Sequence, residues 1–423
     1  MKREIYESYT AILHEELVPA LGCTEPIAIA YTSAVARKAL GREAEGMDVA
    51  CSGNIIKNVK SVIVPNSGGQ HGVEIAAILG MLRGDADLGL EVLRPVEEED
   101  RRRAEELKAR GFCSCSLIEG DENLHIIVTL RAGDDVVEAE TRTAHTHIVR
   151  VTKNGVDLFT QPDYAKSAQG DKSLLNTRDI LQFAREVNLD DVSQVLERQI
   201  AYNSAISREG LDNLYGAGIG RMLLRHGDCG DIRLRAKAAA AAGSDARMSG
   251  CDLPVVINSG SGNQGITASL PVVAYAEKLS CGREPLLRAL VVSNLIALMQ
   301  KKHIGSLSAF CGAVCAAVGA ACGIAYLHGD GFSVIADTIT NSLATISGMV
   351  CDGAKASCAA KIAQALDNAL MAYDLAKDGF VFRPGDGLVK SDVDKTVASV
   401  GRMGRMGMEQ TDIEILHIML END

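Results

Sequence analysis

The chain has 423 residues, of which 47% are hydrophobic and 23% are charged, values typical of a globular protein with room for two or three domains. Its net charge of −12 is the opposite of the positive charge that binds nucleic-acid phosphates, so we expect no nucleic-acid partner. The N-terminal residues carry charges throughout and lack the apolar core of a signal peptide, which predicts a cytoplasmic protein. In that reducing compartment the 12 cysteines are expected to be thiols or metal ligands rather than disulfides.

The first two predicted helices flank a cysteine. Residues 5–17 have an amphipathic pattern that predicts a helix, and the Ala-rich residues 27–40 predict a second one. Cys23 lies just before the second helix, with Pro26 in its first turn. Because the helix dipole stabilises a thiolate at this end, Cys23 is a candidate for chemistry. The alternative is a thiol that is merely buried in a turn.

The remainder of the N-terminal region reads mainly as strands. Residues 47–65 have β character, and residues 112–157 contain several short alternating runs that predict antiparallel strands. The charged residues 97–110 predict a solvated helix between them. Cys113 and Cys115 share one face of a predicted strand, where core packing is their expected role.

The pattern changes near the middle of the chain. Residues 161–171 are polar and predict a linker, and from Thr177 onward the pattern is helical nearly throughout. We therefore predict an α+β fold, in which an N-terminal mixed α/β domain, residues 1–165, packs on a mostly α-helical catalytic domain, residues 166–423. Cys23 then has to reach across from the first domain, so we expect the site to lie between the two.

Two stretches rich in Gly, Ser and Asn interrupt the helical pattern, residues 243–248 and 258–265. The second is dense in hydroxyls, amides and backbone N–H donors, which suits the carboxylate and amino groups of a small zwitterion better than an ordinary solvent turn. Arg247, in the first stretch, has the fork geometry for a bidentate carboxylate contact. The residues expected to bind the substrate are Asn58, Arg247, Ser259, Ser261, Asn263 and Gln264.

Residues 306–327 contain three cysteines and no charged residue. If this segment is helical, Cys311, Cys315 and Cys322 lie on one stripe of its surface. Its length also satisfies the rule for a membrane span, but no second span or basic flanking loop accompanies it, so we expect no membrane partner. Core packing is the other explanation for such cysteines. The following stretch contains Cys351 and Cys358, and two thiol-bearing segments indicate a soft-metal or iron–sulfur site.

Five motifs of the chain resemble those of one family. LGCTEPIAIA, SDARMSG, NSGSGNQGITASLPVV, LSAFC and SGMVCDGAKASCA closely resemble the L-cysteine desulfidases, a family related to the iron–sulfur-dependent L-serine dehydratases. The similarity extends from about Tyr9 to the QTDIEIL near the C-terminus. The chain departs from the family at AHTHIV, where a glycine commonly precedes His-Thr, and this gives His145 less weight as a functional group.

The resemblance implies an oxygen-sensitive [4Fe–4S] cluster that is held by three cysteines and leaves one iron open. Carried over by motif, the ligands are Cys23, Cys311 and Cys351. Cys358 has a counterpart in some relatives, so it is either a ligand or a thiol beside the cluster. The other cysteines of residues 306–327 lie outside the recurring motifs, and we do not expect them to be ligands.

The implied reaction converts L-cysteine and water to sulfide, ammonia and pyruvate without pyridoxal phosphate. An open iron acts as a Lewis acid on the leaving sulfur, and a positioned base removes the Cα proton. Lys57, Glu25 and His145 are the candidates for that base. The same elimination on L-serine is the alternative reaction, and an iron–sulfur regulator that senses an amino acid is an alternative of another class. We expect a small amino acid as ligand and a homodimer as assembly.

Overall fold

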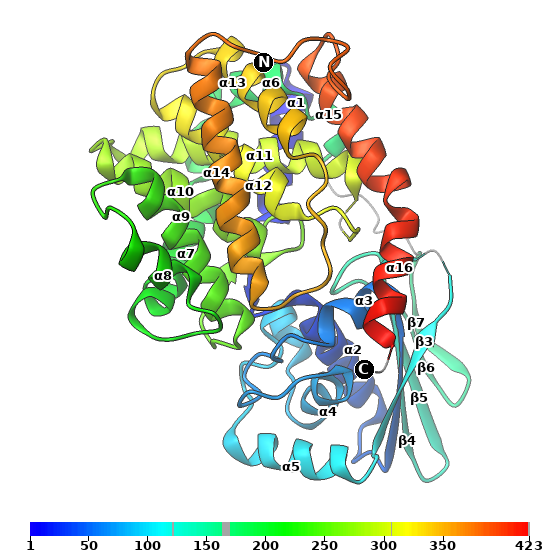
Figure 1. Ribbon diagram of the computed structural model, residues 1–423. Helices are drawn as coiled ribbons and strands as arrows, with labels where there is room; N and C mark the ends of the chain where they lie inside the picture. The colour runs from blue at the N-terminus through cyan, green and yellow to red at the C-terminus, as the bar shows by residue number, and fades with distance from the viewer. Residues whose placement is uncertain (121, 163–169, 306, 422–423) are drawn as a thin grey trace.

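The computed structural model of the chain describes residues 1–120, 122–162, 170–305 and 307–421. Two parts lie one above the other in Figure 1, a helical part and a part built on a six-stranded sheet. The predicted α+β class is therefore confirmed. The predicted domain boundary at residues 165 and 166 lies outside the described residues.

The sheet has the strand order β3-β2-β4-β5-β6-β7. Its strands are β2 Gly46–Ser52, β3 Cys113–Ile118, β4 His125–Ala132, β5 Asp135–Arg142, β6 Ile148–Lys153 and β7 Val156–Thr160. Neighbouring strands are antiparallel except for β2 and β3, which are parallel because α3, α4 and α5 connect them. The prediction of antiparallel strands is therefore correct for β4 to β7 and wrong for β3.

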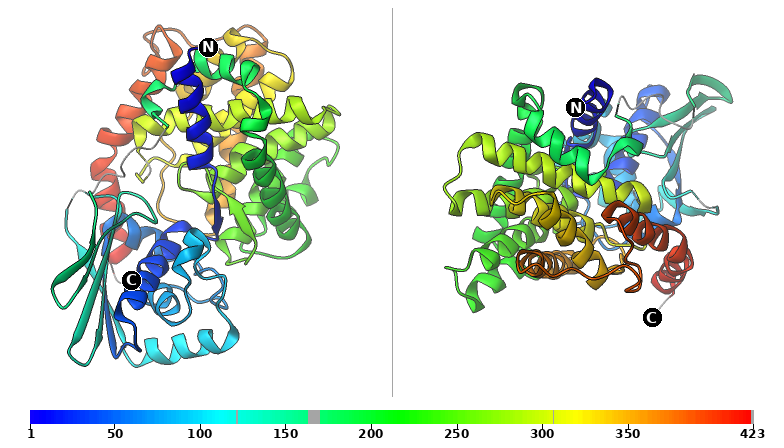
Figure 2. Two further views of the ribbon diagram at one scale, coloured as in Figure 1. Left: turned by 180° about the vertical axis from the view of Figure 1, so that it is seen from behind. Right: turned by 90° about the horizontal axis from the view of Figure 1, so that it is seen from above.

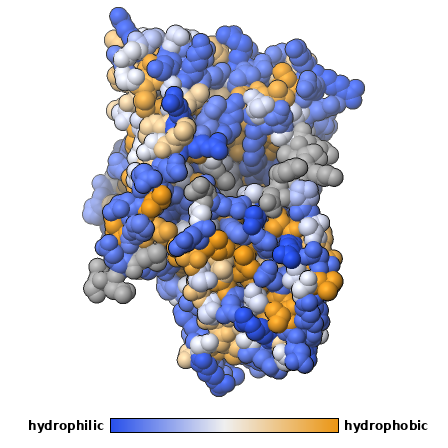
Figure 3. Space-filling model, turned by 90° about the vertical axis from the view of Figure 1, so that its right-hand side faces the viewer, coloured by the Kyte–Doolittle hydropathy of each residue, from blue (hydrophilic) through white to orange (hydrophobic). Residues whose placement is uncertain are grey.

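One face of this sheet is covered by helices and the other is open. Val49, Val128 and Ala139 lie opposite one another on adjacent strands and are buried beneath α2 Thr24–Leu40. Figure 2 shows α2 and α4 Val73–Leu82 on this side, and α5 Glu98–Ala109 lies against α4. In Figure 3, apolar side chains gather among polar ones in the lower half of the view, and β7 is exposed along its whole length. Along β4 buried residues alternate with less buried ones, as expected of an antiparallel sheet with one solvated face.

The helical part is packed around α12 Gly312–Leu327, whose residues are almost entirely small and apolar. A Cβ atom at Gly319 would lie 2.4 Å from the carbonyl oxygen of Ser293, so only glycine permits the close approach of α12 to its neighbour. Among the described residues, no helix is long and apolar enough to cross a membrane. The other helices of this part are α6 Thr177–Glu186, α7 Ser193–Asp212, α8 Ile219–His226, α9 Ile232–Met248, α10 Gly262–Lys278, α11 Arg283–Ile304, α13 Phe332–Thr345, α14 Ser357–Lys377 and α15 Val393–Arg402.

Both ends of the chain join one part to the other. Helix α1 Arg3–Glu16 packs in the helical core, and β1 Pro19–Leu21 pairs with β8 Pro254–Val256 before the chain enters the sheet part at α2. At the other end, α16 Glu409–Leu420 lies beside α3 Gly53–Val59 of the sheet part (Figure 1). The region between the two parts is therefore bounded by segments that are distant in sequence.

Two local predictions were wrong. Residues 53–59 form α3 rather than a continuation of β2, because short apolar runs fit a helix and a strand equally well by pattern. Residues 243–248 do not interrupt a helix but complete α9. A Cβ atom on Gly243 would meet Ile266 at 3.3 Å, so the small residues of this stretch allow close packing rather than a turn.

The cysteines of two predicted segments also require correction. Helix α12 begins only after Cys311, which is its N-cap, so Cys311 does not share a helical stripe with Cys315 and Cys322. The latter two are fully buried in the helical core. Ser306, the first residue of that segment, lies outside the described residues. In β3, Cys113 is buried as predicted, whereas Cys115 is exposed because this edge strand is only partly covered.

Candidate active site

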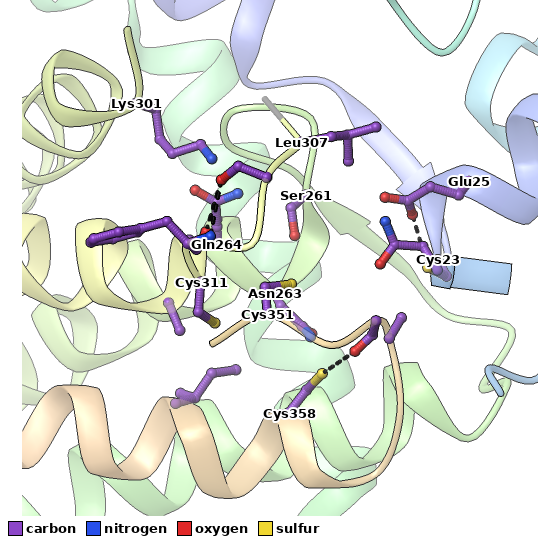
Figure 4. A pocket seen from close by; sticks show the side chains of 18 of the residues that line it. Cys23, Glu25, Ser261, Asn263, Gln264, Lys301, Leu307, Cys311, Cys351 and Cys358 are labelled. Atoms are coloured by element: carbon purple, nitrogen blue, oxygen red, sulfur yellow. Dashed lines mark hydrogen bonds between the residues drawn. The ribbon is translucent and has the colours of Figure 1, made fainter. Parts of the chain in front are cut away.

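A cavity of about 100 Å³ lies between the two parts of the molecule. It is lined by the first turns of α2 and α10, the end of α9, parts of α3 and α11, and the two segments that carry the remaining cysteines (Figure 4). The predicted residues that line this cavity are Cys23, Glu25, Asn58, Arg247, Ser261, Asn263, Gln264, Cys311, Cys351 and Cys358. The other predicted residues, Lys57, His145 and Ser259, do not line it.

Two cysteines are brought together by a short backbone bridge. The N–H of Cys311 donates to the carbonyl of Met349 at 2.9 Å, and the N–H of Cys351 donates to the carbonyl of Ala309 at 2.7 Å. The neighbouring Cys311 thiol and the Lys57 ammonium lower the pKa of Cys351 against the effect of burial. The neighbouring Cys351 and burial raise the pKa of Cys311. Residues forty positions apart are thereby fixed side by side.

Cys358 lies in the first turn of α14, facing the same bridge. Its thiol donates to the carbonyl of Gly353 at 3.7 Å. Burial raises the pKa of Cys358, and the nearby Cys351 raises it further. Gly353 has a φ of +93°, and a Cβ atom there would lie 2.5 Å from the carbonyl oxygen of Lys57. Only glycine therefore lets the segment of Cys351 pack so closely on α3. We call Cys311, Cys351 and Cys358 the thiol wall, because all three line the cavity from the bridge and the start of α14 (Figure 4).

Cys23 packs in one small hydrophobic cluster with Met248, Ala354 and Cys358. It is the N-cap of α2, and its buried thiol donates to Oε2 of Glu25 at 3.0 Å. Burial raises the pKa of Cys23, the Glu25 carboxylate raises it further, and Arg247 opposes them. The hydroxyl of Thr24 donates to the carbonyl of Gly260 at 2.9 Å and fastens this turn to the loop before α10. Figure 4 shows Cys23 and Glu25 across the cavity from Cys311.

The thiol wall fits an iron–sulfur cluster by the chemistry of its donors. No three His, Cys, Asp or Glu side chains of the described residues are gathered around one point, as a single ion would require. A mononuclear site needs every ligand atom within roughly 2.0–2.3 Å of the metal. A cluster instead offers a separate iron to each thiolate, so its ligands surround a cavity.

Another part of the cavity lining is polar, and it adjoins the thiol wall where the side chain of Gln264 packs against Gly312, the residue after Cys311. Arg247, in the last turn of α9, is 2% exposed. The buried atoms Arg247 Nε, Asn263 Oδ1 and Gln264 Oε1 have no hydrogen-bond partner among the described residues. Ser261 is the N-cap of α10, whose first turn contains Asn263 and Gln264 and presents free backbone N–H groups. We call Arg247, Ser261, Asn263 and Gln264 the polar wall.

The three predicted residues outside the cavity have identifiable surroundings. Lys57 is buried and forms an ion pair with Asp412 of α16. His145 lies against the loop before α10, where a Cβ atom on Gly260 would be 3.2 Å from its ring, and burial lowers its pKa. Ser259 has a φ of +53° in the turn that precedes α10. All three support cavity-lining segments rather than the cavity itself.

Lys301 of α11 also lines the cavity, although it is not among the residues predicted from the sequence. Its side chain is 4% exposed and lines the cavity, pointing inward on the side of Cys311 and Gln264 (Figure 4). The available signal was a lysine one helical turn after Ala297 and Leu298, both of which are buried. Burying a charged side chain is costly, so a lysine on the buried face of a helix indicates a position with a particular role.

Comparison with known proteins agrees with this architecture. The profile of the family described as serine dehydratase alpha chain matches residues 87–417. The chain belongs to this family. Proteins named only as UPF0597 protein are similar over nearly their whole length. The relative from Lachnoclostridium phytofermentans is 50% identical over 98% of this chain and 100% of its own length. The relative from Finegoldia magna is 48% identical over 98% of this chain and 100% of its own length. The relative from Treponema denticola is 47% identical over 99% of this chain and 98% of its own length. The predicted relationship to the iron–sulfur serine dehydratases is thus confirmed at the level of family.

Proposed function

We propose that the protein is an iron–sulfur-dependent lyase that converts L-cysteine and water to sulfide, ammonia and pyruvate. The observation that carries this proposal is one cavity lined by both the thiol wall and the polar wall, in which Arg247 Nε has no hydrogen-bond partner among the described residues. The polar wall suits the carboxylate of an amino acid, and the thiol wall suits a metal group that would contact its β-substituent.

The thiol wall would hold the cluster. Cys23 and Cys358 pack in one cluster beside Cys311 and Cys351. The Cys23 thiol donates to Glu25, which favours Cys358 as third ligand, in contrast to the set that the motifs suggest. When bound, the cluster supplies a Lewis-acidic iron to the leaving group.

The polar wall would orient the substrate. Arg247 is positioned to bind its carboxylate, and the free N–H groups at the start of α10 add donors for the same anion. The amide oxygens of Asn263 and Gln264 are acceptors for its ammonium group. These contacts would fix the Cα–H and Cβ–S bonds relative to the two walls.

Glu25 is the base that the geometry favours. Of the three candidates it alone lines the cavity, while Lys57 is paired with Asp412 and His145 lies behind the α10 loop. Its carboxylate would accept the Cα proton as the Cβ–S bond breaks and sulfide departs. The remaining aminoacrylate tautomerises and hydrolyses to pyruvate and ammonia. Cys23, by donating to Oε2, would orient this carboxylate.

L-serine is the second candidate substrate, because the matching family is described as serine dehydratase. Anaerobically reconstituted protein should be assayed with L-cysteine and L-serine side by side for pyruvate, and for sulfide with L-cysteine. We expect pyruvate and sulfide in equal amounts from L-cysteine. Pyruvate from L-serine alone would assign the second function. Binding without product from either amino acid, in protein with its full cluster, would contradict both and favour an amino-acid-sensing regulator.

A further inference from the structure

The turn that leads into α10 places the polar wall. In this turn, residues 258–261, the N–H of Asn258 donates to the carbonyl of Ser261 and the N–H of Ser261 donates to the carbonyl of Asn258, both at 3.1 Å. Between them Ser259 has a φ of +53°, a left-handed conformation that persists only where the surroundings hold it. Because Ser261 ends the turn and caps α10, a shift of the turn would displace the polar wall.

The turn is attached to the helical part by buried amide side chains. Asn258 is 0% exposed, and its Nδ2 donates to Oδ1 of Asn294 in α11 at 2.9 Å and to the carbonyl of Asn294 at 3.3 Å. Gln199 of α7 donates from Nε2 to Asn294 Oδ1 at 3.0 Å, and Asn294 Nδ2 donates to Gln199 Oε1 at 2.8 Å. We call Gln199, Asn258 and Asn294 the amide network. It holds the turn from the helical part, as the hydroxyl of Thr24 does from the sheet part.

Helix α7 also fixes the strand that precedes the turn. Asn203, one helical turn after Gln199, accepts at Oδ1 from the N–H of Val256 at 2.9 Å and donates from Nδ2 to the carbonyl of Val256 at 3.3 Å. The first turn of α10 packs on this strand, since a Cβ atom on Gly265 would lie 1.9 Å from the carbonyl oxygen of Val256. Two amides of one helix therefore set where β8, the turn and the start of α10 lie.

Stability alone does not explain why these positions are amides. Burying an amide has a desolvation cost, and apolar residues of the same shape in place of a hydrogen-bonded pair are often nearly neutral for stability. The neighbouring Leu196 of α7 and Leu295 of α11 are apolar and fully buried, so this helix interface accepts such residues. Hydrogen bonds differ from apolar contacts because they depend on direction, so a fully buried amide network specifies one orientation of the turn.

We propose that Gln199 and Asn294 are positioning residues, which hold the turn of residues 258–261 so that the polar wall meets the carboxylate and ammonium groups of the substrate. This inference rests on the proposed function, since it needs the polar wall to bind an amino acid. Neither residue is among those that line the cavity, so each acts through Asn258 rather than by touching the substrate. Their loss should weaken substrate binding and leave the thiol wall, which belongs to other segments, unchanged.

The test compares Gln199→Leu, Asn258→Ala and the double variant with wild type. Leucine at 199 removes both hydrogen bonds to Asn294 at a similar size, and alanine at 258 detaches the turn from Asn294. Ser293→Ala is the matched control. Ser293 precedes Asn294 in α11 and is equally buried, but its hydroxyl donates to the carbonyl of Ala268 at 2.6 Å rather than to the amide network.

The readouts are KM and kcat of the reconstituted enzyme, the affinity of the metal-free protein for L-alanine, and Tm. L-alanine has the carboxylate and ammonium groups of the proposed substrate without a leaving group, so its binding reports on the polar wall alone. A merely stabilising role of the amides would lower Tm without changing KM or the affinity for L-alanine.

We expect Gln199→Leu and Asn258→Ala each to raise KM about tenfold with kcat nearly unchanged, and to weaken L-alanine binding by the same factor, because displaced orienting groups have effects of this order or larger. Since Gln199 reaches the turn through Asn294 and Asn258, the double variant should bind no more weakly than Asn258→Ala. Ser293→Ala should match wild type in KM and in L-alanine affinity.

Wild-type KM and L-alanine affinity in either single variant would overturn the inference, and so would multiplying effects in the double variant. Asn258→Ala, which changes a turn rather than a helix interface, gives the decisive result if Gln199→Leu does not fold. A wild-type protein that binds no L-alanine when metal-free and converts neither L-cysteine nor L-serine when reconstituted would instead contradict the proposed function itself.

Discussion

The thiol wall and the polar wall of the cavity differ in how complete they are without a ligand. The thiol wall is held by backbone hydrogen bonds between its two segments, and its sulfur atoms contact their own surroundings. The polar wall leaves Arg247 Nε, Asn263 Oδ1 and Gln264 Oε1 buried and unpaired among the described residues. Because buried polar atoms are nearly always hydrogen-bonded, these three atoms are open to a partner with donors and acceptors of its own. In the proposed function the thiol wall holds a resident group and the polar wall a transient one.

Removing a sulfur from the thiol wall should have the largest effect. Cys351→Ala is expected to abolish bound iron and activity together, because cluster attachment depends on each thiolate. Iron content, the visible absorption spectrum and pyruvate formation measure this. Cys322→Ala is the control, since Cys322 is a fully buried thiol in the core of α12 that does not line the cavity. The control should keep its iron and lose only about 1–2 kcal/mol of stability.

One pair of results would contradict the prediction for Cys351. If Cys322→Ala lost its iron while Cys351→Ala kept both iron and activity, the cluster would not be held by the thiol wall.

Removing the guanidinium from the polar wall should leave the iron in place. Arg247→Met is expected to lower kcat/KM by about 100-fold or more, because a charge-assisted contact to a carboxylate is worth roughly 1.5–3 kcal/mol and its loss also misplaces the substrate. Arg235→Met, at an exposed position of the same helix α9, provides the control. An Arg247→Met enzyme with wild-type kcat/KM would remove Arg247 from the substrate site.

The smallest effect is expected for Cys23, whose thiol donates to Glu25. Cys23→Ala should keep its iron and lower kcat about tenfold with little change in KM, because the carboxylate of Glu25 loses a hydrogen bond that orients it. Iron analysis and steady-state kinetics distinguish the outcomes. Loss of iron in Cys23→Ala would show that Cys23 is a ligand, as the family motifs suggest, and would erase the distinction between the two sides.

Sequence patterns were sufficient to predict many of the residues that line the cavity. Cys23, Cys311 and Cys351 stand in long recurring motifs, and the dense polar loop before α10 indicated the substrate side, so these residues could be found without a structure. Lys301 could not be assigned in the same way. Its helix is buried on nearly every face, so periodicity does not reveal which residue faces a cavity.

The errors in secondary structure have a common cause. The short apolar run of α3 and the small residues near the end of α9 are each compatible with more than one local conformation. Contacts with distant segments decided between them: α3 packs against α16, and Gly243 of α9 lies against Ile266 of α10. Intrinsic helix and strand preferences are small, so tertiary packing of this kind overrides them.

By itself, the sequence determined the α+β class, the family and the residue types that the chemistry requires, because hydrophobic periodicity and long motifs are local properties of the chain. Tertiary structure alone decided which thiols are neighbours. The bridge between the segments of Cys311 and Cys351 and the turn that carries Cys358 form one wall, while the start of α2 places Cys23 beside Glu25. Hydrogen bonds between residues far apart in sequence fix these positions, and no local pattern of residues encodes such distances.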